Sequence, residues 1–553
     1  MPSAVTSSSP SARERRAPAY AGRTRARALF VVLFALTAAF RFLALKNGFV
    51  NDHFVYISGG QQMLLGAWPT RDWIDPGLPL MFGASALAQQ IFGPTLFAEA
   101  MLVAIAFGLG AAFTAGAVRR LTGSLLLAIL AVLFEVAVFP RTYSYPKILA
   151  YAFVFWLYGC YLARPDRTRL FAIAAGVVVA FLFRHDHGLF LGAGGLLTIL
   201  LARSADGWRS ALRAAATYTV FVLLLTLPYL LYVQWYTGLW TYLRTGVEFS
   251  QREAIRQWHV WPRVIGDAQP LQSVLLYELY ALPIVALGLL LVRRARIDWR
   301  TVAAQVAPLA LVALFVDFSF LRDPLETRLP DAIVPAVLLG AWLISRAFSP
   351  SRLRLLTAPV ALGCTVVVGL SVLTVGATHE QIDRAGLLGN RREIPHRFVE
   401  RTADLRARFT DYQLPMPSTR SLVPFFRYVA RCTSPEDRLL VGGFMVEVPF
   451  YAQRLFAGGQ EYFGTYFGSE ANQRFAFDRL QRERVPFVII PSDYQESFDN
   501  TFPLVVDYIR PRYVPLTDVV VDDELTIHVL VDRTWGTATR DAETGWPCAP
   551  REP

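Results

Sequence analysis

Long apolar runs constrain the fold of this chain more than any other feature. Runs of about 20 apolar residues, the length that crosses a bilayer as a helix, recur between residues 28 and 376. The hydrophobic fraction of 54% is too high for a soluble chain of this size. Residues 378–553 have an ordinary mixed composition. We therefore predict a multi-span membrane domain at 28–377 and a separate domain at 378–553, which is long enough to bury its own core.

The basic residues lie in short clusters between the apolar runs, within a net charge of +11. This distribution is typical of membrane topology, because Lys and Arg are retained on the cytoplasmic side, and it argues against nucleic-acid binding. Residues 1–27, rich in Ser, Ala and Arg, are predicted to be a disordered cytoplasmic arm that touches anionic lipid. The run 29–45 is too long for a signal-peptide core, so we expect it to be an uncleaved first span.

Placing every basic cluster inside gives one consistent topology. The apolar piece 78–92 is marginal for a span, and laying it along the outer interface keeps Arg119 and Arg120 inside. The result is a polytopic α-helical protein of the cytoplasmic membrane with about eleven spans, its amino terminus inside and its C-terminal domain outside. The predicted spans include about 28–46, 95–118, 123–140, 148–163, 213–236 and 355–376.

The stretch after the first span is the strongest candidate for chemistry. It belongs to a predicted outer loop, 47–94, which is polar, aromatic and rich in turn residues. Asp52 lies one or two residues past the membrane exit, and Asp72 and Asp75 form a second acidic cluster. An ordinary surface loop with solvated carboxylates is the alternative, and composition alone does not separate the two.

The same outer face collects basic residues, against the general tendency for them to lie inside. An anionic ligand would explain them, and ion pairing with neighbouring acids is the plainer explanation. Lysine is rare in this chain, and Lys147 suits a point-charge contact to phosphate. The candidate ligand-binding side chains are His53, Arg71, Arg141, Lys147, Arg184, His185, His187 and Arg328.

The tail is predicted to be an extracytoplasmic α/β domain. A helical pattern covers 423–431, and short buried-strand patterns cover 438–441, 485–490 and 525–531. Cys432 and Cys548 both lie in this domain, on the oxidising side, and can pair, although spacing leaves two free thiols possible.

Motifs for metals and nucleophiles are few. His185 and His187 have a His-x-His spacing that would suit a metal on an extended loop, but a solvated or ion-paired cap at a span end is the favoured alternative. The sequence contains no HExxH, CxxC or GxSxG motif and no phosphate-binding loop. We assign no residue as a metal ligand.

The order of these features resembles the membrane-embedded GT-C glycosyltransferases, the group of the protein O-mannosyltransferases and the lipid A aminoarabinose transferase. A first span, an acid just outside it, a G-x-x-P-x-R-D-x-x-x-P-x-x-P-L motif and an interface helix follow in sequence. A later segment, 326–335, resembles the Arg-x-x-x-P-x-x-P stretch of these enzymes. The residues that match the first motif and its preceding acid are Asp52, Gly66, Pro69, Arg71, Asp72, Pro76, Pro79 and Leu80.

The resemblance implies an inverting hexosyl or pentosyl transfer from a polyprenyl-phosphate sugar to a glycan, lipid or protein acceptor outside the membrane. Phosphate is a good leaving group, so one carboxylate suffices as general base, and cationic side chains hold the leaving phosphate. We predict Asp52 as that base, with Asp72 as second choice because Arg71 beside it lowers its basicity. No cofactor is certain. A divalent metal is possible, although many relatives have a second acid where this chain has His53.

Two other functions fit the same topology. One is a non-catalytic envelope-assembly protein whose tail binds a glycan or a partner. The other is a transporter of lipid-linked sugars, which would more often carry charged groups near the bilayer midplane. Only the enzyme needs a carboxylate at Asp52, so that residue separates the three.

Overall fold

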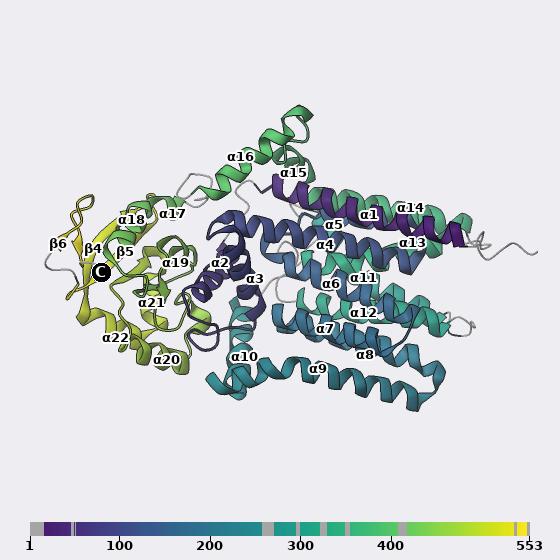
Figure 1. Ribbon diagram of the computed structural model, residues 1–553, viewed down its shortest axis with the longest axis horizontal. Coiled ribbons are helices and arrows are strands. Elements are labelled where there is room, and N and C mark those ends of the chain that lie inside the picture. Colours follow the sequence, from purple (N-terminus) through teal and green to yellow (C-terminus); the bar gives the residue numbers. More distant parts are fainter. Residues whose placement is uncertain are drawn as a thin grey trace, which may run out of the picture.

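The protein consists of a helical bundle and a C-terminal α/β domain, with two short helices between them (Figure 1). In this computed structural model, the bundle helices run side by side, as expected for a polytopic membrane protein. The structure describes residues 16–45, 49, 51–256, 270–292, 294, 299–320, 329–348, 354–407, 417–535 and 539–549.

Each predicted span corresponds to a helix of the bundle. Seven of the described helical stretches are long and apolar enough to cross a membrane, and α5 and the apolar part of α13 are shorter apolar segments. The helix α1 begins at Arg16, so helical structure extends into the segment expected to be a disordered arm. The bundle comprises α1 (Arg16–Leu43), α4 (Leu96–Thr122), α5 (Leu125–Ala137), α6 (Tyr145–Ala163), α7 (Arg167–Phe183), α8 (His185–Arg203), α9 (Trp208–Tyr236), α11 (Pro270–Val292), α12 (Trp299–Phe320), α13 (Leu329–Ala347) and α14 (Arg354–Val375).

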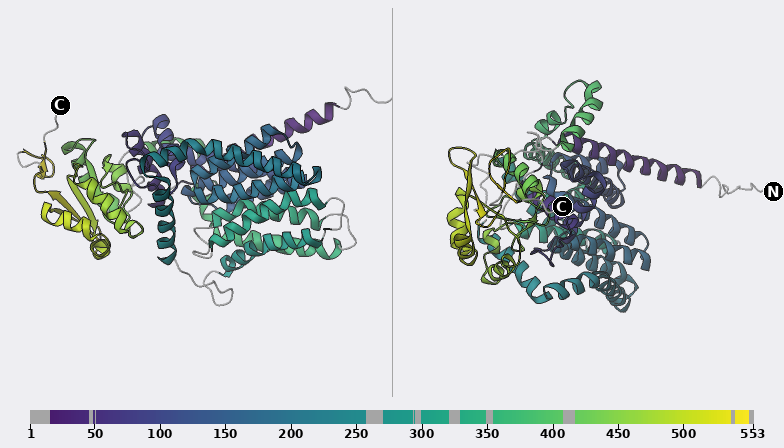
Figure 2. Two further views of the ribbon diagram at one scale, coloured as in Figure 1. Left: turned by 90° about the horizontal axis from the view of Figure 1, so that it is seen from below. Right: turned by 60° about the vertical axis from the view of Figure 1, so that its left-hand side comes forward.

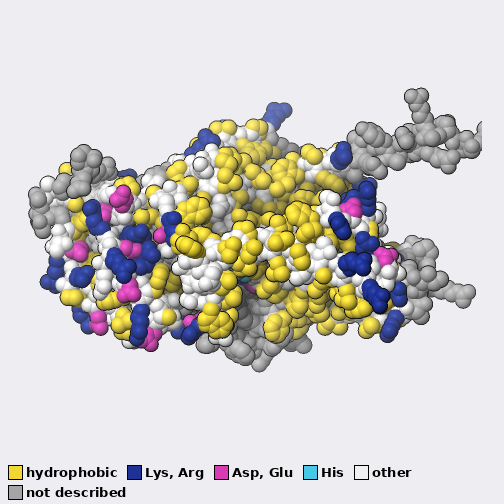
Figure 3. Space-filling model, turned by 60° about the horizontal axis from the view of Figure 1, so that its bottom comes forward, with side chains coloured by type: hydrophobic (Ala, Val, Ile, Leu, Met, Phe, Trp, Pro, Cys, Tyr) yellow, Lys and Arg dark blue, Asp and Glu magenta, His cyan; other side chains and the backbone are white. Residues whose placement is uncertain are grey.

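The bundle has two chemically different ends. One, the domain end, faces the C-terminal domain, and the other, the basic end, carries many basic side chains, which are arginines, beyond a broad apolar belt (Figure 3). Three helices cover the domain end: α2 (Asn51–Leu64), α3 (Pro79–Phe92) and α10 (Leu239–Arg256). The last of these runs across the bundle axis (Figure 2, left). The segment 78–92 therefore packs on the end of the bundle as α3, as the sequence predicts.

A mixed five-stranded sheet forms the centre of the C-terminal domain. Its order is β2-β1-β3-β5-β4, with β1 parallel to β2 and β3 and with β5 antiparallel to β3 and β4. The predicted disulfide is confirmed, because Cys432 and Cys548 are bonded. The strands of this domain are β1 (Arg438–Val441), β2 (Leu455–Phe456), β3 (Phe487–Pro491), β4 (Tyr513–Val520), β5 (Thr526–Asp532), β6 (Thr539–Arg540) and β7 (Pro547–Cys548).

Helices cover the sheet and connect the domain to the bundle. The helices α15 and α16 lean away from the bundle before the chain enters the domain (Figure 1). In this connection Phe398 of α16 stacks on Phe42 of α1, with ring centroids 5.6 Å apart. The remaining helices are α15 (Thr378–Arg384), α16 (Ile394–Arg406), α17 (Pro417–Ser421), α18 (Val423–Cys432), α19 (Glu447–Ala452), α20 (Glu470–Leu480), α21 (Ser492–Thr501) and α22 (Pro503–Arg512), with short 3-10 turns η1 (Thr142–Ser144), η2 (Ser204–Asp206), η3 (Arg391–Glu393) and η4 (Thr465–Phe467).

Candidate active site at the domain end

The helix α2 is fixed to the C-terminal domain by polar side chains on one face. The Ser58 hydroxyl donates to the carbonyl of Val446 at 2.6 Å. One turn later, the Gln62 amide donates to the carbonyl of Arg454 at 2.9 Å, and its Oε1 accepts from the Phe456 backbone N–H at 2.9 Å. Residues four apart share a helix face, so this face of α2 is a docking surface for the domain.

A second, fully buried network holds α2 to α3 and α4. The His53 ring lies 2.9 Å from Glu99, Nε2 to Oε2, and both side chains are inaccessible to solvent. The same carboxylate accepts from the Ser85 hydroxyl, and Gln89 donates to Ser85 at 3.1 Å and to the Ile57 carbonyl at 2.9 Å. The structure thus places His53, a predicted ligand-binding residue, inside the protein, where it orients the first turn of α2.

Asp52 lies in that first turn, and its side chain is exposed. One turn further on, Tyr56 is buried, and the groups whose charges act on its hydroxyl are Arg184, Asp52, Tyr143 and Glu461. Burial raises the pKa of Tyr56, Arg184 opposes that rise, and Asp52 and Glu461 add to it. These side chains share one neighbourhood, which we call the Tyr56 cluster. It combines an exposed carboxylate, a guanidinium and phenol hydroxyls.

Glu461 reaches this cluster from the C-terminal domain, in the loop that follows β2. It is nine-tenths buried, and its Oε1 has no hydrogen-bond partner within the described part of the chain. Burial raises the pKa of Glu461 well above its usual range, because it disfavours the charged form. A protonated carboxyl can donate a hydrogen bond, whereas the exposed Asp52 can accept a proton.

Cationic side chains gather where α6 and α8 begin. Arg184, at the junction of α7 and α8, binds Asp186 through two contacts, Nε–Oδ1 at 3.2 Å and Nη2–Oδ2 at 2.9 Å. The Tyr151 hydroxyl of α6 is hydrogen-bonded to His187 Nδ1. Lys147, a buried residue, lies one turn before Tyr151 on the same face of α6. The His-x-His pair therefore occupies the first turn of a helix rather than an extended loop, and His187 lies 3.9 Å from Asp186.

The other two predicted cations, Arg141 and Arg328, differ in whether the structure describes them. Arg141 precedes η1, and its Nη1 donates to the Tyr143 hydroxyl at 3.1 Å, which connects it to the Tyr56 cluster. Arg328 lies outside the described residues. The sequence predicts that Lys147, Arg184 and Arg328 converge on one site. Lys147 and Arg184 lie at the same end of neighbouring helices, and the position of Arg328 stays a prediction.

Asp72 makes its hydrogen bonds within the first loop, on a side away from the Tyr56 cluster. Its carboxylate accepts from the Trp68 N–H at 2.7 Å and from Arg71 Nε at 2.7 Å. Arg71 also donates to the Gly66 carbonyl at 2.5 Å. Arg479 of α20 lies 4.0 Å from Asp72, so the pair faces the C-terminal domain rather than the Tyr56 cluster.

His185 belongs to a third buried group, centred on Asp75. Asp75 Oδ1 accepts the Gly77 N–H at 2.8 Å, and its Oδ2 accepts from the hydroxyls of Tyr229 at 3.4 Å and Tyr242 at 3.3 Å. The His185 ring is 2.9 Å from the Tyr242 hydroxyl. Burial raises the pKa of Asp75, and the backbone N–H groups and His185 oppose that rise. This group connects the first loop to α8, α9 and α10.

Sequence reasoning missed Tyr56, Tyr143 and Glu461. The aromatic character of the first outer loop was part of the prediction, but neither Tyr56 nor Tyr143 was assigned a role, because an aromatic residue alone does not indicate a ligand. Glu461 lies about 400 residues from Asp52 in the chain, and its acid within a glycine- and aromatic-rich loop, GGQEYFG, was the available signal. Within the described ranges, no three His, Cys, Asp or Glu side chains come close enough to hold a metal ion.

No protein-family model matches this chain, and no curated protein matches it. Two solved structures of ArnT from Cupriavidus metallidurans are similar to it. The structure bound to undecaprenyl phosphate is 15% identical, with a TM-score of 0.49, and covers 90% of this chain and 97% of its own. The apo structure is 15% identical, with a TM-score of 0.46, and covers 92% and 98%. Because identity is low, we base the assignment of function on this chain's own residues.

Proposed function

We propose that this protein is a membrane glycosyltransferase that transfers a sugar from a polyprenyl-phosphate donor to an acceptor hydroxyl outside the cytoplasmic membrane. The observation that carries this proposal is the Tyr56 cluster. It brings an exposed carboxylate, Asp52, and a guanidinium, Arg184, together at the end of a membrane bundle and beneath a folded domain. A lipid-borne donor and a water-borne acceptor can meet at such a boundary.

The proposed sugar transfer forms one bond to the anomeric carbon and breaks another. The acceptor oxygen attacks the anomeric carbon of the sugar, a new C–O bond forms, and the bond from that carbon to the phosphate oxygen breaks. The electron pair leaves with the polyprenyl phosphate, so no strong general acid is required. Asp52 accepts the proton of the acceptor hydroxyl, and attack from the face opposite the phosphate inverts the anomeric configuration.

Cations near the Tyr56 cluster hold the leaving phosphate as its charge grows. Arg184 is the principal candidate, because its planar guanidinium suits phosphate oxygens, and Lys147 and Arg141 approach from the start of α6. Tyr56 provides a hydrogen-bond donor in the same neighbourhood, and Glu461 provides a buried carboxyl group whose pKa is raised. His53 positions the first turn of α2, which carries Asp52, through its buried contact with Glu99.

The orientation follows from the same reasoning. The basic end of the bundle is cytoplasmic, because Lys and Arg are retained on that side, and the domain end is extracytoplasmic. The donor's lipid tail lies among the bundle helices, while its sugar reaches the cluster. The acceptor approaches between the first loop and the C-terminal domain.

The test is transfer by the purified full-length protein from a panel of polyprenyl-phosphate sugars, with released polyprenyl phosphate as the readout. Asp52→Asn keeps size and removes the base, so we expect turnover to fall roughly 10²–10⁴-fold. Asp72→Asn, in the same loop, is the matched control and should retain most of its activity if it folds normally. A parallel reaction with EDTA reports whether a divalent metal takes part.

Each outcome of this test leads to a different conclusion. Normal transfer by Asp52→Asn with loss in Asp72→Asn would reverse the assignment of the base. Normal transfer by both variants would remove this loop from the chemistry. Release of no polyprenyl phosphate from any donor in the panel would favour the assembly or transport functions.

A further inference from the structure

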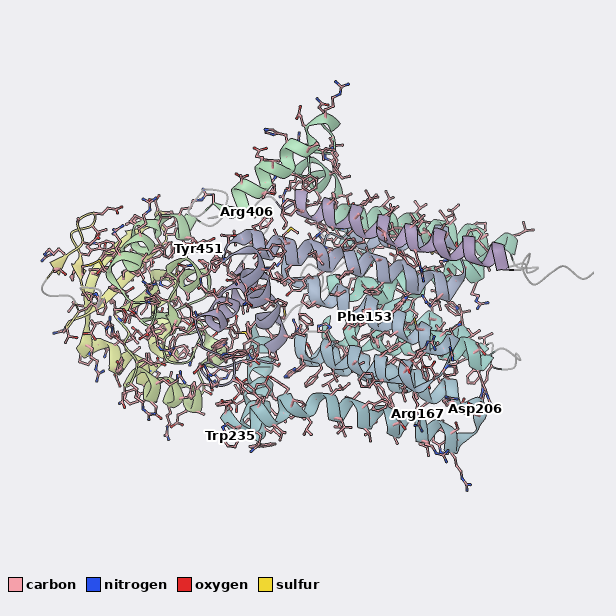
Figure 4. The ribbon with its side chains drawn as sticks, in the orientation of Figure 1. Phe153, Arg167, Asp206, Trp235, Arg406 and Tyr451 are labelled. Carbon is pink, nitrogen blue, oxygen red and sulfur yellow. A yellow bond between two sulfur atoms is a disulfide. The ribbon has the colours of Figure 1, made fainter. Side chains whose placement is uncertain are left out.

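The bundle contains a cavity at its basic end, far from the Tyr56 cluster. Its volume is about 310 Å³, and it lies among α4, α6, α8, α12 and α13. Figure 4 marks this end of the bundle with Arg167 and Asp206. Its lining includes Arg120, Leu162, Leu201, Ala202 and Arg300.

The lining of this cavity is amphiphilic. Most of it consists of apolar side chains such as Leu162 and Leu201, whereas Arg120 and Arg300 supply two positive charges. Arg120 is held over the ring of Trp156, 5.2 Å from its centroid, and the absence of a side chain at Gly159 makes room for it. An added Cβ at Gly159 would lie 3.0 Å from Arg120 Cδ.

The arginines at this end fall into two sets, those paired with an acid and those, including Arg120 and Arg300 as well as Arg209 and Arg213, without a carboxylate partner among the described residues. At the same end, Arg169 is paired with Asp166, and Arg203 is paired with Asp206. Among the residues that the structure describes, no carboxylate pairs with Arg120 or Arg300. Both residues are exposed, so their charges are open to water or to a ligand, and within the described ranges no acid of the chain occupies the space beside them.

The position of the cavity indicates which kind of anion would bind there. Its arginines belong to the basic end of the bundle, and Figure 3 shows that the apolar belt gives way to basic side chains at that end, which is the depth of lipid phosphates. A small soluble anion would leave the apolar wall unfilled, and a neutral hydrocarbon would leave two arginines without a counter-ion. An amphiphile with an anionic head satisfies both.

We propose that this cavity binds an anionic phospholipid of the adjacent leaflet, with its phosphate between Arg120 and Arg300 and acyl chain against the apolar wall. The site is separate from the proposed active site, because the two lie at opposite ends of the bundle. Its occupation ties α4 to α12 and stabilises the helices between them.

The test compares lipid binding by the full-length protein in detergent. Added phosphatidylglycerol should raise the melting temperature and remain bound in native mass spectrometry, whereas phosphatidylcholine and inorganic phosphate should do neither. The double variant Arg120→Gln/Arg300→Gln should weaken phosphatidylglycerol binding at least about tenfold. The matched control is Arg209→Gln/Arg213→Gln, which removes two exposed arginines of α9 at the same end that do not line the cavity.

A second variant tests the cavity without changing the charge of its lining. Ala202→Phe fills the cavity without removing an arginine, so it should also displace the lipid. Equal binding of phosphatidylglycerol by the control and the arginine double variant would overturn the proposal. Equal protection by inorganic phosphate would overturn the assignment to a lipid, and equal protection by phosphatidylcholine would overturn the role of the arginines.

Discussion

Gln62 is the side chain on which docking of the C-terminal domain depends most. It is fully buried in α2, and its amide makes two hydrogen bonds of 2.9 Å, one to the carbonyl of Arg454 and one from the N–H of Phe456. Arg454 directly precedes β2, the edge strand of the five-stranded sheet, and Phe456 is the last residue of that strand. Gln62 thus satisfies an edge of the sheet that would otherwise need another partner.

The change Gln62→Leu removes both bonds while keeping a side chain of similar size. It leaves a backbone carbonyl and a backbone N–H buried without partners, at about 1–3 kcal/mol each. We therefore expect docking to weaken by about 2–6 kcal/mol. Gln61→Leu is the matched control, because Gln61 is the neighbouring residue with the same chemistry but makes one bond, to the Phe450 carbonyl at 3.2 Å.

Hydrogen exchange of the full-length protein in detergent measures this difference. Peptides covering α2 and residues 446–456 should exchange much faster in Gln62→Leu than in wild type, by about tenfold for every 1.4 kcal/mol lost when exchange follows this opening. Gln61→Leu should have a smaller effect. Equal exchange in the two variants, or a larger effect of Gln61→Leu, would refute the assignment of Gln62 as the main link.

Three further predictions concern the C-terminal domain and its side of the membrane. Replacing Cys432 and Cys548 by Ser should destabilise the domain by about 2–5 kcal/mol, as measured by denaturant unfolding, and an unchanged midpoint would contradict this. Burial raises the pKa of Glu447 to about 7 from its ordinary 4.5, so the folded state holds the proton more tightly. The contribution of Glu447 to stability should therefore be largest below about pH 4.5 and fall by roughly 3 kcal/mol between about pH 4.5 and 7. Glu447→Gln should remove that part of the slope in thermal melts, and an unchanged slope would exclude Glu447 as its source. A reporter active only in the cytoplasm and fused after Val375 should be silent, and activity would reverse the proposed orientation.

The layout of the bundle was predictable because it depends on local composition. Apolar runs and basic clusters determine where helices lie and turn, and the helices observed follow those ranges. The position of α3 was predictable for the same reason, since 78–92 is too short to cross comfortably. The start of α1 at Arg16 was not, because a Ser-, Ala- and Arg-rich segment has little periodicity.

The candidate site was only partly predictable, because contacts between distant segments decide which side of each residue is buried. Asp52 and His53 are adjacent in sequence, yet the first is exposed and the second is inaccessible. The difference comes from Glu99 of α4, which pairs with His53 and directs that face of α2 inward. Glu461 was not identifiable, because its place beside Tyr56 depends on how the C-terminal domain folds back.

The contacts that α2 makes on its other faces hold Asp52 in position. His53 fixes the first turn of this helix to α4, while Ser58 and Gln62 fix the following turns to the C-terminal domain. A proton acceptor must keep its position to within a fraction of an ångström of the reacting hydroxyl, and a helix held on two sides restrains it better than a free loop. The same restraint makes the domain part of the proposed active site. Movement of the domain would shift Glu461 and Asp52 relative to each other, so activity should depend on docking even when every residue of the Tyr56 cluster is intact.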